Sequence, residues 1–155
     1  MKIEKASMDE LDIVEKITRY TIETVYTHYY AKGAVDFFLQ HHNPENIRAD
    51  IEAGIVFLLK EGNENIGTVT VKENAVNRLF ILPEYQKKGY GTKLMDFAEK
   101  TISAKYEEIV LDASLPAKRM YEKRGYEKTE SHEIQTENGD YLCYDVMKKS
   151  SKETG

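Results

Sequence analysis

The sequence contains one cysteine, Cys143, among its 155 residues, so no disulfide can form within the chain. It also has no cluster of cysteine and histidine residues with the spacing of zinc ligands, and we assign no metal. Both features are typical of proteins from a reducing compartment. We therefore expect a cytoplasmic protein without a structural metal.

Long apolar runs are also missing. None approaches the roughly 20 residues that a membrane-spanning helix needs. Residues 1–16 mix acidic and basic side chains and lack the continuous apolar segment of a signal or transit peptide. Hydrophobic residues make up 41% of the chain and charged residues 32%, which is a normal globular composition. We expect a soluble protein with no membrane partner.

An excess of basic residues is absent as well. The chain has 22 basic and 27 acidic residues and a formal net charge of −5, so binding to the phosphate backbone of a nucleic acid has little electrostatic support. The length fits one ordinary domain. We expect that domain to span residues 1–149 and the small polar tail, residues 150–155, to be disordered.

Hydrophobic periodicity predicts alternating strands and helices along the chain. Ser7, with Glu10 three positions later, resembles a capping box and precedes apolar residues at helical spacing. The expected helices begin at residues 7, 45, 89 and 116, and the expected strands cover residues 2–6, 55–60, 66–72, 75–82, 108–111, 126–135 and 141–147. The predicted order is β-α-α-β-β-β-α-β-α-β-β.

The most informative segment covers residues 79–94. A strand ends at Pro83, and after a short loop Gly89 and Gly91 open a helix. A helix N-terminus leaves backbone N–H groups unpaired and carries partial positive charge, and glycines let an anion approach closely. Lys87 and Lys88 add positive potential. The segment therefore predicts an anion-binding loop, although two glycines before a helix are also typical of an ordinary flexible loop.

A dinucleotide-binding fingerprint is the obvious alternative for this segment, because Asp112 ends the next strand about 20 residues later. However, Leu94 occupies the position of the third glycine, and several residues separate the strand from Gly89. The chain also lacks the glycine-lysine pattern of a P-loop.

A second segment, residues 112–126, passes directly from a strand into a helix that opens at Pro116 and closes at Gly125. Ala117 and Tyr121 are one turn apart and share a helix face. Taken alone, Tyr121 is also typical of a core aromatic residue with a hydrated hydroxyl.

Together the two segments resemble the paired acetyl-CoA motifs of GNAT (GCN5-related N-acetyltransferase) enzymes. The first reads Ile81-x-Pro83 and then Gln86-x-x-Gly89-x-Gly91, and the second reads Ala117-x-x-x-Tyr121-x-x-x-Gly125-Tyr126. The resemblance covers residues 1–149. It implies an α/β (α+β) domain with the acyl-CoA N-acyltransferase fold, in which helices flank a mixed, mostly antiparallel sheet of about seven strands.

The resemblance implies an N-acetyltransferase that uses acetyl-CoA as cosubstrate. A primary amine of a small molecule or peptide would attack the thioester directly, through a tetrahedral intermediate. The strand carrying Ile81 would diverge from the strand carrying Leu111 and leave a notch for the cofactor. Tyr121 would protonate the departing thiolate. The implied cofactor-binding residues are Phe80, Ile81, Leu82, Gln86, Lys87, Lys88, Gly89, Tyr90, Gly91, Thr92, Ser114, Ala117 and Tyr121.

Two residues depart from the family pattern. Asn77 stands where relatives often carry a glutamate, and an amide cannot act as a base. Glu73 is the nearest upstream carboxylate and is a candidate catalytic residue, although a solvated hairpin position also explains it. Ser114 stands where many relatives have asparagine, and it either bonds the pantetheine arm or only caps the following helix.

Other readings stay open at this point. A non-catalytic acyl-CoA-binding module or sensor would explain Asn77, whereas Tyr121 argues for catalysis. The aromatic segment of residues 26–42 suits either an acceptor pocket or packing in the core and a homodimer. The sequence does not specify the acceptor amine, the acyl-chain preference or the oligomeric state.

Overall fold

The computed structural model describes residues 1–153. Seven strands form one sheet in the order β1-β2-β3-β4-β5-β7-β6, with β4 and β5 parallel and all other neighbours antiparallel. The number of strands and their mostly antiparallel pairing confirm the expectation. The strands are β1 (Lys2–Lys5), β2 (Val56–Glu61), β3 (Glu64–Lys72), β4 (Ala75–Ile81), β5 (Glu108–Ala113), β6 (Glu127–Gln135) and β7 (Tyr141–Ser150).

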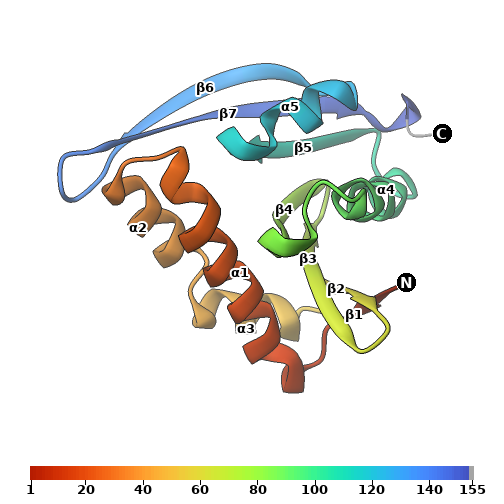
Figure 1. Cartoon of the computed structure of the whole chain (residues 1–155). Helices are drawn as coiled ribbons and strands as arrows, with labels where there is room; N and C mark the ends of the chain where they lie inside the picture. The colour runs from red at the N-terminus through yellow and green to blue at the C-terminus, as the bar shows by residue number, and fades with distance from the viewer. Residues whose placement is uncertain (154–155) are drawn as a thin grey trace.

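Helices cover both faces of the sheet (Figure 1). They are α1 (Leu11–Val25), α2 (Lys32–His41), α3 (Pro44–Glu52), α4 (Tyr90–Ser103) and α5 (Leu115–Lys123). Short 3-10 turns precede α1, join α1 to α2, follow β4 and follow β7. At the first of these turns, the Ser7 N–H donates to Glu10 Oε1 at 3.0 Å, as a capping box requires. Helices α1 to α3 cover one face, and α4 and α5 cover the other.

The prediction of two helices between the first two strands was wrong, because the structure has three. The missed helix is α2, in which Gly33 lies in the first turn and is buried. Its N–H donates to Asp140 Oδ2 at 2.8 Å, and a β-carbon there would collide with Thr136 and Asn138. Glycine therefore permits the close approach of α2 to the β6–β7 turn.

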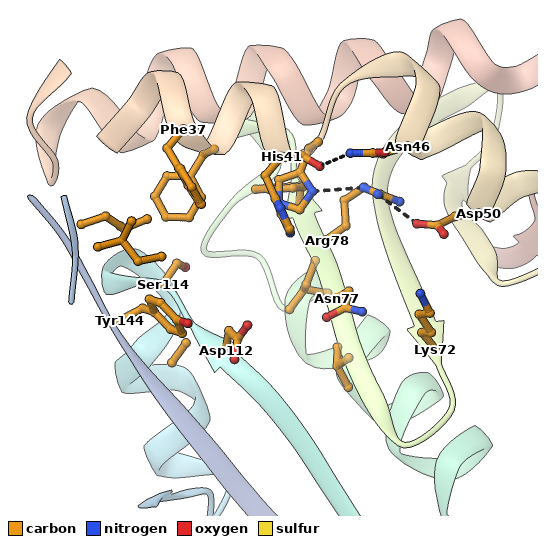
Figure 2. Close-up of a pocket in the computed structure, with 18 of the residues that line it drawn as sticks. Phe37, His41, Asn46, Asp50, Lys72, Asn77, Arg78, Asp112, Ser114 and Tyr144 are labelled. Carbon is orange, nitrogen blue, oxygen red and sulfur yellow. Dashed lines mark hydrogen bonds and ion pairs between the residues drawn. The ribbon is translucent and has the colours of Figure 1, made fainter. Parts of the chain in front are cut away.

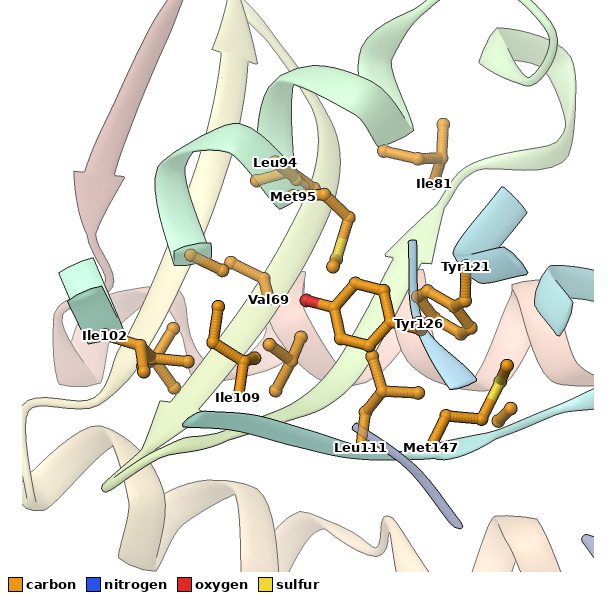
Figure 3. Close-up of a cluster of buried hydrophobic side chains, with 14 of the residues drawn as sticks. Val69, Ile81, Leu94, Met95, Ile102, Ile109, Leu111, Tyr121, Tyr126 and Met147 are labelled. Carbon is orange, nitrogen blue, oxygen red and sulfur yellow. The ribbon is translucent and has the colours of Figure 1, made fainter. Parts of the chain in front are cut away.

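The core on the α4 and α5 face is built from aliphatic side chains and two tyrosines (Figure 3). Leu94, Met95 and Ile102 form the buried stripe of α4 and are at most 1% exposed. They pack on Val69 of β3 and on residues of β4 and β5. This packing holds the N-terminus of α4 against the ends of the central strands.

A second core lies under α1, α2 and α3. Val14 and Ile22 of α1 and Ile47 of α3 are fully buried against Leu58 of β2. Asn43 caps α3, because its side chain accepts a hydrogen bond from the Asn46 N–H at 2.8 Å. These helices therefore pack closely against the face of the sheet beside β4.

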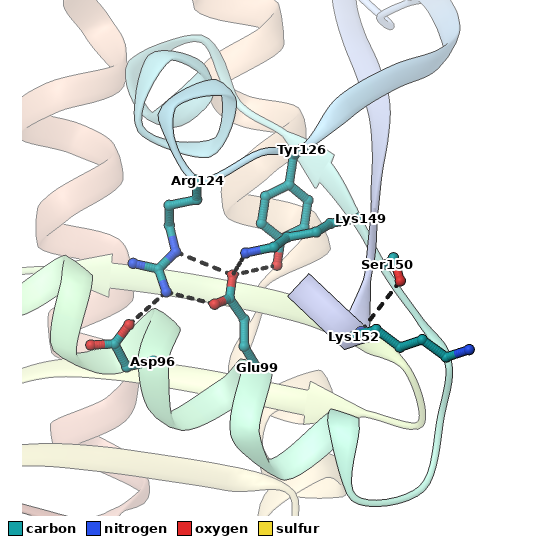
Figure 4. Close-up of polar contacts among 7 residues, drawn as sticks. All are labelled: Asp96, Glu99, Arg124, Tyr126, Lys149, Ser150 and Lys152. Carbon is teal, nitrogen blue, oxygen red and sulfur yellow. Dashed lines mark hydrogen bonds and ion pairs between the residues drawn. The ribbon is translucent and has the colours of Figure 1, made fainter. Parts of the chain in front are cut away.

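A buried carboxylate joins the α4 side of the sheet to β7 (Figure 4). Glu99 is 3% exposed, and its oxygens accept hydrogen bonds from Arg124 Nη2 at 2.6 Å and Tyr126 Oη at 2.9 Å. Lys149 Nζ lies 3.6 Å away. Burial alone would lower the pKa of Arg124, but hydrogen bonds to Glu99 and Asp96 outweigh it and raise that pKa. The network ties together α4, the end of α5 and the last strand.

Residues 150–153, which follow the expected domain, have regular secondary structure. Strand β7 continues through Ser150, and residues 151–153 form a 3-10 turn. Ser151 is 6% exposed and its hydroxyl donates to the Tyr106 carbonyl at 2.6 Å, so this end is anchored by burial and hydrogen bonding. Residues 154 and 155 of the predicted tail lie outside the described residues. Within the described chain, no helix has the length and apolar character needed to cross a bilayer.

We expect Glu99→Ala to lower the free energy of unfolding by about 3 kcal/mol, because it leaves the buried Lys149 ammonium without a carboxylate and removes the buried partner of Arg124. Asp96→Ala is the matched control, since Asp96 also contacts Arg124 but its side chain is 62% exposed. Its loss should be about 1 kcal/mol or less. Urea denaturation followed by circular dichroism measures both. Equal losses for the two variants would contradict the assigned role of Glu99.

Candidate active site

A cavity of about 580 Å³ lies between helices α2 and α3 and the middle of the sheet. Phe37 and His41 of α2 stand on one side of it and Tyr144 of β7 on another (Figure 2). Asn77 of β4 and Asp112 of β5 lie at its sheet side. The cavity is therefore aromatic along its walls and polar where it meets the sheet.

The cavity meets the sheet where β4 and β5 separate. These strands pair only through Ala75↔Val110 and Val76↔Leu111. The register between β3 and β4 shifts at the same level, and Arg78 adopts a φ of 49°. Such a bulge bends the strand that carries it. The expected divergence of the strands carrying Ile81 and Leu111 is thus confirmed.

Arg78 is the centre of a buried polar cluster at this bulge (Figure 2). It is 8% exposed and lies 3.0 Å from the Asp50 carboxylate of α3. Its Nη1 donates to Thr70 Oγ1 at 3.0 Å and its Nε donates to His42 Nδ1 at 3.3 Å. Burial lowers the pKa of Arg78, and the Asp50 carboxylate opposes that shift. The cluster links the bulge to the junction of α2 and α3.

The end of β4 directs backbone groups toward the gap. The Leu82 N–H donates to the Ile66 carbonyl of β3 at 2.9 Å. Because successive residues of an antiparallel strand alternate in hydrogen-bond direction, the N–H and C=O of Ile81 point away from β3. Gln86 Nε2 donates to that Ile81 carbonyl at 2.9 Å. The Ile81 N–H therefore faces the side of the sheet that β5 has left open.

The loop after β4 runs through a 3-10 turn, Pro83–Tyr85, and then reverses before α4. Lys87 and Gly89 both have left-handed backbone angles, with φ of 63° and 88°. Helix α4 begins immediately after Gly89, so its first backbone N–H groups have no partner within the helix. A β-carbon added at Gly89 would meet no atom within 4 Å. Gly89 thus opens a positively polarised helix end to an incoming anion.

Tyr121 of α5 faces the cavity from the opposite face of the sheet. It is 5% exposed, and burial raises its pKa well above the usual value for tyrosine. Tyr26, from the second core, approaches the same place, and burial raises its pKa also, against a hydrogen bond to Ser114. Ser114 occupies the N-cap position of α5, but its side chain makes no capping hydrogen bond. The structure therefore does not support the alternative in which the Ser114 side chain only caps α5.

Comparisons with known proteins decide the family. A family model described as an acetyltransferase (GNAT) domain matches residues 25–148. The chain belongs to the GNAT acetyltransferase family.

Individual relatives agree with this GNAT assignment. An N-alpha-acetyltransferase from Saccharolobus solfataricus is 28% identical over 140 residues, which cover 81% of this chain and 80% of the relative. The structure of a GCN5-related N-acetyltransferase from Rhodopseudomonas palustris superposes with a TM-score of 0.86 at 20% identity, covering 96% of this chain and 94% of the other. PaiA N-acetyltransferase from Thermoplasma acidophilum in complex with coenzyme A gives a TM-score of 0.72 at 20% identity, with coverages of 96% and 98%. The predicted fold class is confirmed.

The structure places three of the predicted GNAT site residues at the cavity. Phe80, Ser114 and Tyr121 line the cavity. The loop residues Gln86 to Gly91 and Thr92 follow the end of β4 and enter α4, and Ala117 lies one turn before Tyr121 on α5. Their individual roles stay predictions.

Glu73 does not join this group. It lies in the tight turn between β3 and β4, has a φ of 54°, is exposed, and does not line the cavity. Asn77, in contrast, does line it. Glu73 therefore makes no contact with the cavity.

The Arg78 cluster and the cavity position of Asp112 are features that sequence reasoning missed. A charged residue inside an apolar strand was the available signal for Arg78, since it stands between Val76 and Phe80. Its partners Asp50 and His42 come from distant helices and carry no local pattern. Among residues 1–153, no group of three or more metal-binding side chains is present.

His42 should remain neutral across the physiological pH range. Burial, with smaller effects from Arg78 and His41, lowers the pKa of His42 from 6.5 to about 3. Between these values the unfolded chain binds a proton that the folded chain does not, so the free energy of unfolding should fall as pH falls. The slope is about 1.4 kcal/mol per pH unit.

Urea denaturation at a series of pH values tests this expectation. His42→Asn should lose that acid-side slope while keeping an acceptor for Arg78. His28→Asn removes an exposed histidine and should leave the wild-type slope unchanged. A His42→Asn profile parallel to that of the wild type would contradict the assignment.

Proposed function

We propose that this protein transfers the acetyl group of acetyl-CoA to a primary amine. The observation that carries the proposal is the early separation of β4 and β5 beside a helix that begins at a left-handed glycine. The separated strands leave a slot next to unpaired backbone groups, and the helix start supplies N–H donors at its end. Family membership supports the same activity.

The residues present fit the parts of acetyl-CoA. The first backbone N–H groups of α4 suit the pyrophosphate, together with the Thr92 hydroxyl, and the nearby Lys87 and Lys88 add positive charge. Phe80 and Leu82 flank Ile81, whose backbone faces the strand edge that β5 leaves free, and an extended pantetheine arm can pair with this edge like an added strand. Coenzyme A in the complex of the PaiA enzyme supports this choice of cosubstrate.

Acetyl-CoA, when bound, supplies an activated acyl group. The Ile81 N–H, which points into the gap, is oriented to donate to the thioester carbonyl and to the oxyanion that forms from it. Tyr121 holds a proton that burial keeps in place, because its pKa is raised. That proton is available for the sulfur atom when the carbon–sulfur bond breaks. Tyr121 is therefore the proposed general acid.

The acceptor is proposed to enter from the cavity between α2, α3 and the β6–β7 hairpin. Phe37, Phe38 and Tyr144 offer apolar and aromatic contacts to a small molecule or to a peptide end. The N-alpha-acetyltransferase relative supports an α-amine as one acceptor class.

A non-catalytic acyl-CoA-binding module is the second candidate. Asn77 lines the cavity where related enzymes often have a glutamate, and an amide cannot accept the amine proton. A thiol-release assay with a panel of amines and peptides separates the two functions. Binding of acetyl-CoA without release for any acceptor would favour the module.

Gly89→Ala should weaken acetyl-CoA binding about tenfold, because the strain of a left-handed alanine, roughly 1–2 kcal/mol, disturbs the start of α4. Gly62→Ala is the matched control. Gly62 has a φ of 60°, and an added β-carbon there also meets nothing within 4 Å, but it lies in the distant β2–β3 turn. Isothermal titration calorimetry should show an unchanged Kd for Gly62→Ala. Equal weakening in both variants would contradict the binding role of the α4 start.

Tyr121→Phe should lower kcat by about 100-fold or more, because it removes the proton for the leaving thiolate. Tyr126→Phe is the control, since Tyr126 is also a buried tyrosine, but its hydroxyl bonds Glu99 on the far side of the core. Its kcat should stay close to the wild-type value. Retention of full activity by Tyr121→Phe would remove Tyr121 from the proposed mechanism.

A further inference from the structure

Transfer to an alkylamine needs a group that accepts a proton. Such an amine has a pKa of about 10 and is mostly an ammonium ion at neutral pH, which cannot attack a thioester. Neither position considered from the sequence supplies this group. Asn77 is an amide, and Glu73 lies in the exposed β3–β4 turn outside the cavity lining.

The strand register places another carboxylate directly across the gap from Asn77. Val76 and Leu111 are the last pair between β4 and β5, so Asn77 and Asp112 are the next residues on the two strands. Val76 and Leu111 are buried in the core under α4 and α5. Because side chains alternate along a strand, Asn77 and Asp112 project to the other face, where both line the cavity (Figure 2).

Asp112 differs from the other carboxylate in the lining. Asp50 is held by Arg78 at 3.0 Å. The Asp112 carboxylate has no hydrogen bond or ion pair to another residue in the described part of the chain, and its side chain is exposed toward the cavity. Its two oxygens are therefore free to meet an amine that enters from α2 and α3.

The surroundings of Asp112 favour its protonated form more than bulk water does. Burial raises the pKa of this carboxyl group, and the nearby His41 and His132 oppose the shift. The other titratable or charged groups that line the cavity come from α2, α3, α5 and strands β3, β4 and β7, and they are His42, Asp50, Tyr121, Lys72, Arg78 and Tyr144. Of these, the opposite charges of Arg78 and Asp50 form an ion pair with each other.

We propose that Asp112 is the general base of the acetyl transfer, taking the role that Asn77 cannot fill. The proposal rests on the acetyltransferase activity proposed above. It places the base on β5, across the gap from the usual strand position, with the acid Tyr121 lining the same cavity. The incoming nitrogen then meets Asp112, and the leaving sulfur meets Tyr121.

The proton and electron balance is complete with these groups. Asp112 takes one proton from the ammonium ion and later releases it to solvent. The neutral nitrogen forms a bond to the acetyl carbon, and the electron pair of the carbon–sulfur bond leaves with sulfur. Tyr121 gives its proton to that sulfur, and the proton lost by the acylated nitrogen restores Tyr121. The products are the amide, coenzyme A and one proton.

The test compares Asp112→Asn, Asp112→Glu and the wild type on two acceptor classes. One is an alkyl primary amine. The other is hydrazine or an aniline, whose protonated forms have pKa values below about 8.5, so these acceptors are already neutral at an assay pH of about 8.5 and need no base. Glu108→Gln is the matched control, because Glu108 lies on the same strand and face but outside the cavity. Circular dichroism and acetyl-CoA binding show that each variant is folded.

We expect Asp112→Asn to lower kcat for the alkylamine about 100-fold or more, with the KM for acetyl-CoA little changed. The limb of the pH profile that rises as Asp112 loses its proton should disappear. Asp112→Glu should recover part of the activity, and Glu108→Gln should behave like the wild type. With the low-pKa acceptors the defect of Asp112→Asn should shrink to about tenfold or less.

Three results would overturn the assignment while leaving the acetyltransferase function intact. They are near-wild-type kcat in Asp112→Asn, an equal defect for both acceptor classes, and a defect confined to the KM of the amine, which would mean that Asp112 only binds the ammonium ion. If the wild type itself transfers acetyl to no acceptor although it binds acetyl-CoA, the proposed function fails, and the assignment of Asp112 fails with it.

Discussion

The site depends on the failure of β4 and β5 to stay paired. Two neighbouring strands that remained in register would satisfy each other's backbone groups and close the middle of the sheet. Here the ladder stops at Val76↔Leu111, and the bulge at Arg78 turns β4 away. The separation leaves the Ile81 N–H unpaired by β5 and opens the cavity beneath α2 and α3. The proposed cofactor slot and the proposed acceptor cavity therefore both result from the early end of the β4–β5 pairing.

A buried polar cluster lies on each face of the sheet. On one face, Arg78 fixes the bulge by contacts to Asp50, Thr70 and His42, so a strained backbone is held by a buried polar cluster. On the other, Glu99 gathers Arg124 and its neighbours and holds α4 to the end of α5. A buried charge is tolerated only when it is paired and hydrogen-bonded. The Arg78 cluster therefore fixes the bulge beside the gap, and the Glu99 cluster fixes α4 relative to the end of α5.

Much of the fold could be read from local patterns. The hairpin of β2 and β3, the strand that stops before Pro83 and the helix that starts after Gly89 all follow from short-range chemistry. Helix α2 was not predicted because a tertiary contact, rather than local sequence, explains the glycine in its first turn. Gly33 lowers helix propensity, but it permits close contact with the β6–β7 turn, which lies more than a hundred residues away in the chain. The boundary near residue 150 was also set by tertiary contacts, because Ser151 is held by the Tyr106 carbonyl.

The sequence by itself determined the family, the loop before α4 and the candidate acid Tyr121, because these depend on residue types at fixed local spacing. Only the tertiary structure decided which carboxylate lines the cavity beside Asn77. Glu73 is closer to Asn77 along the chain, but the β3–β4 turn carries it away from the cavity. Asp112 lies opposite Asn77 because two strands, separated by a helix in the sequence, are parallel and in register. Strand register is a pairing between distant segments, and no local pattern encodes it.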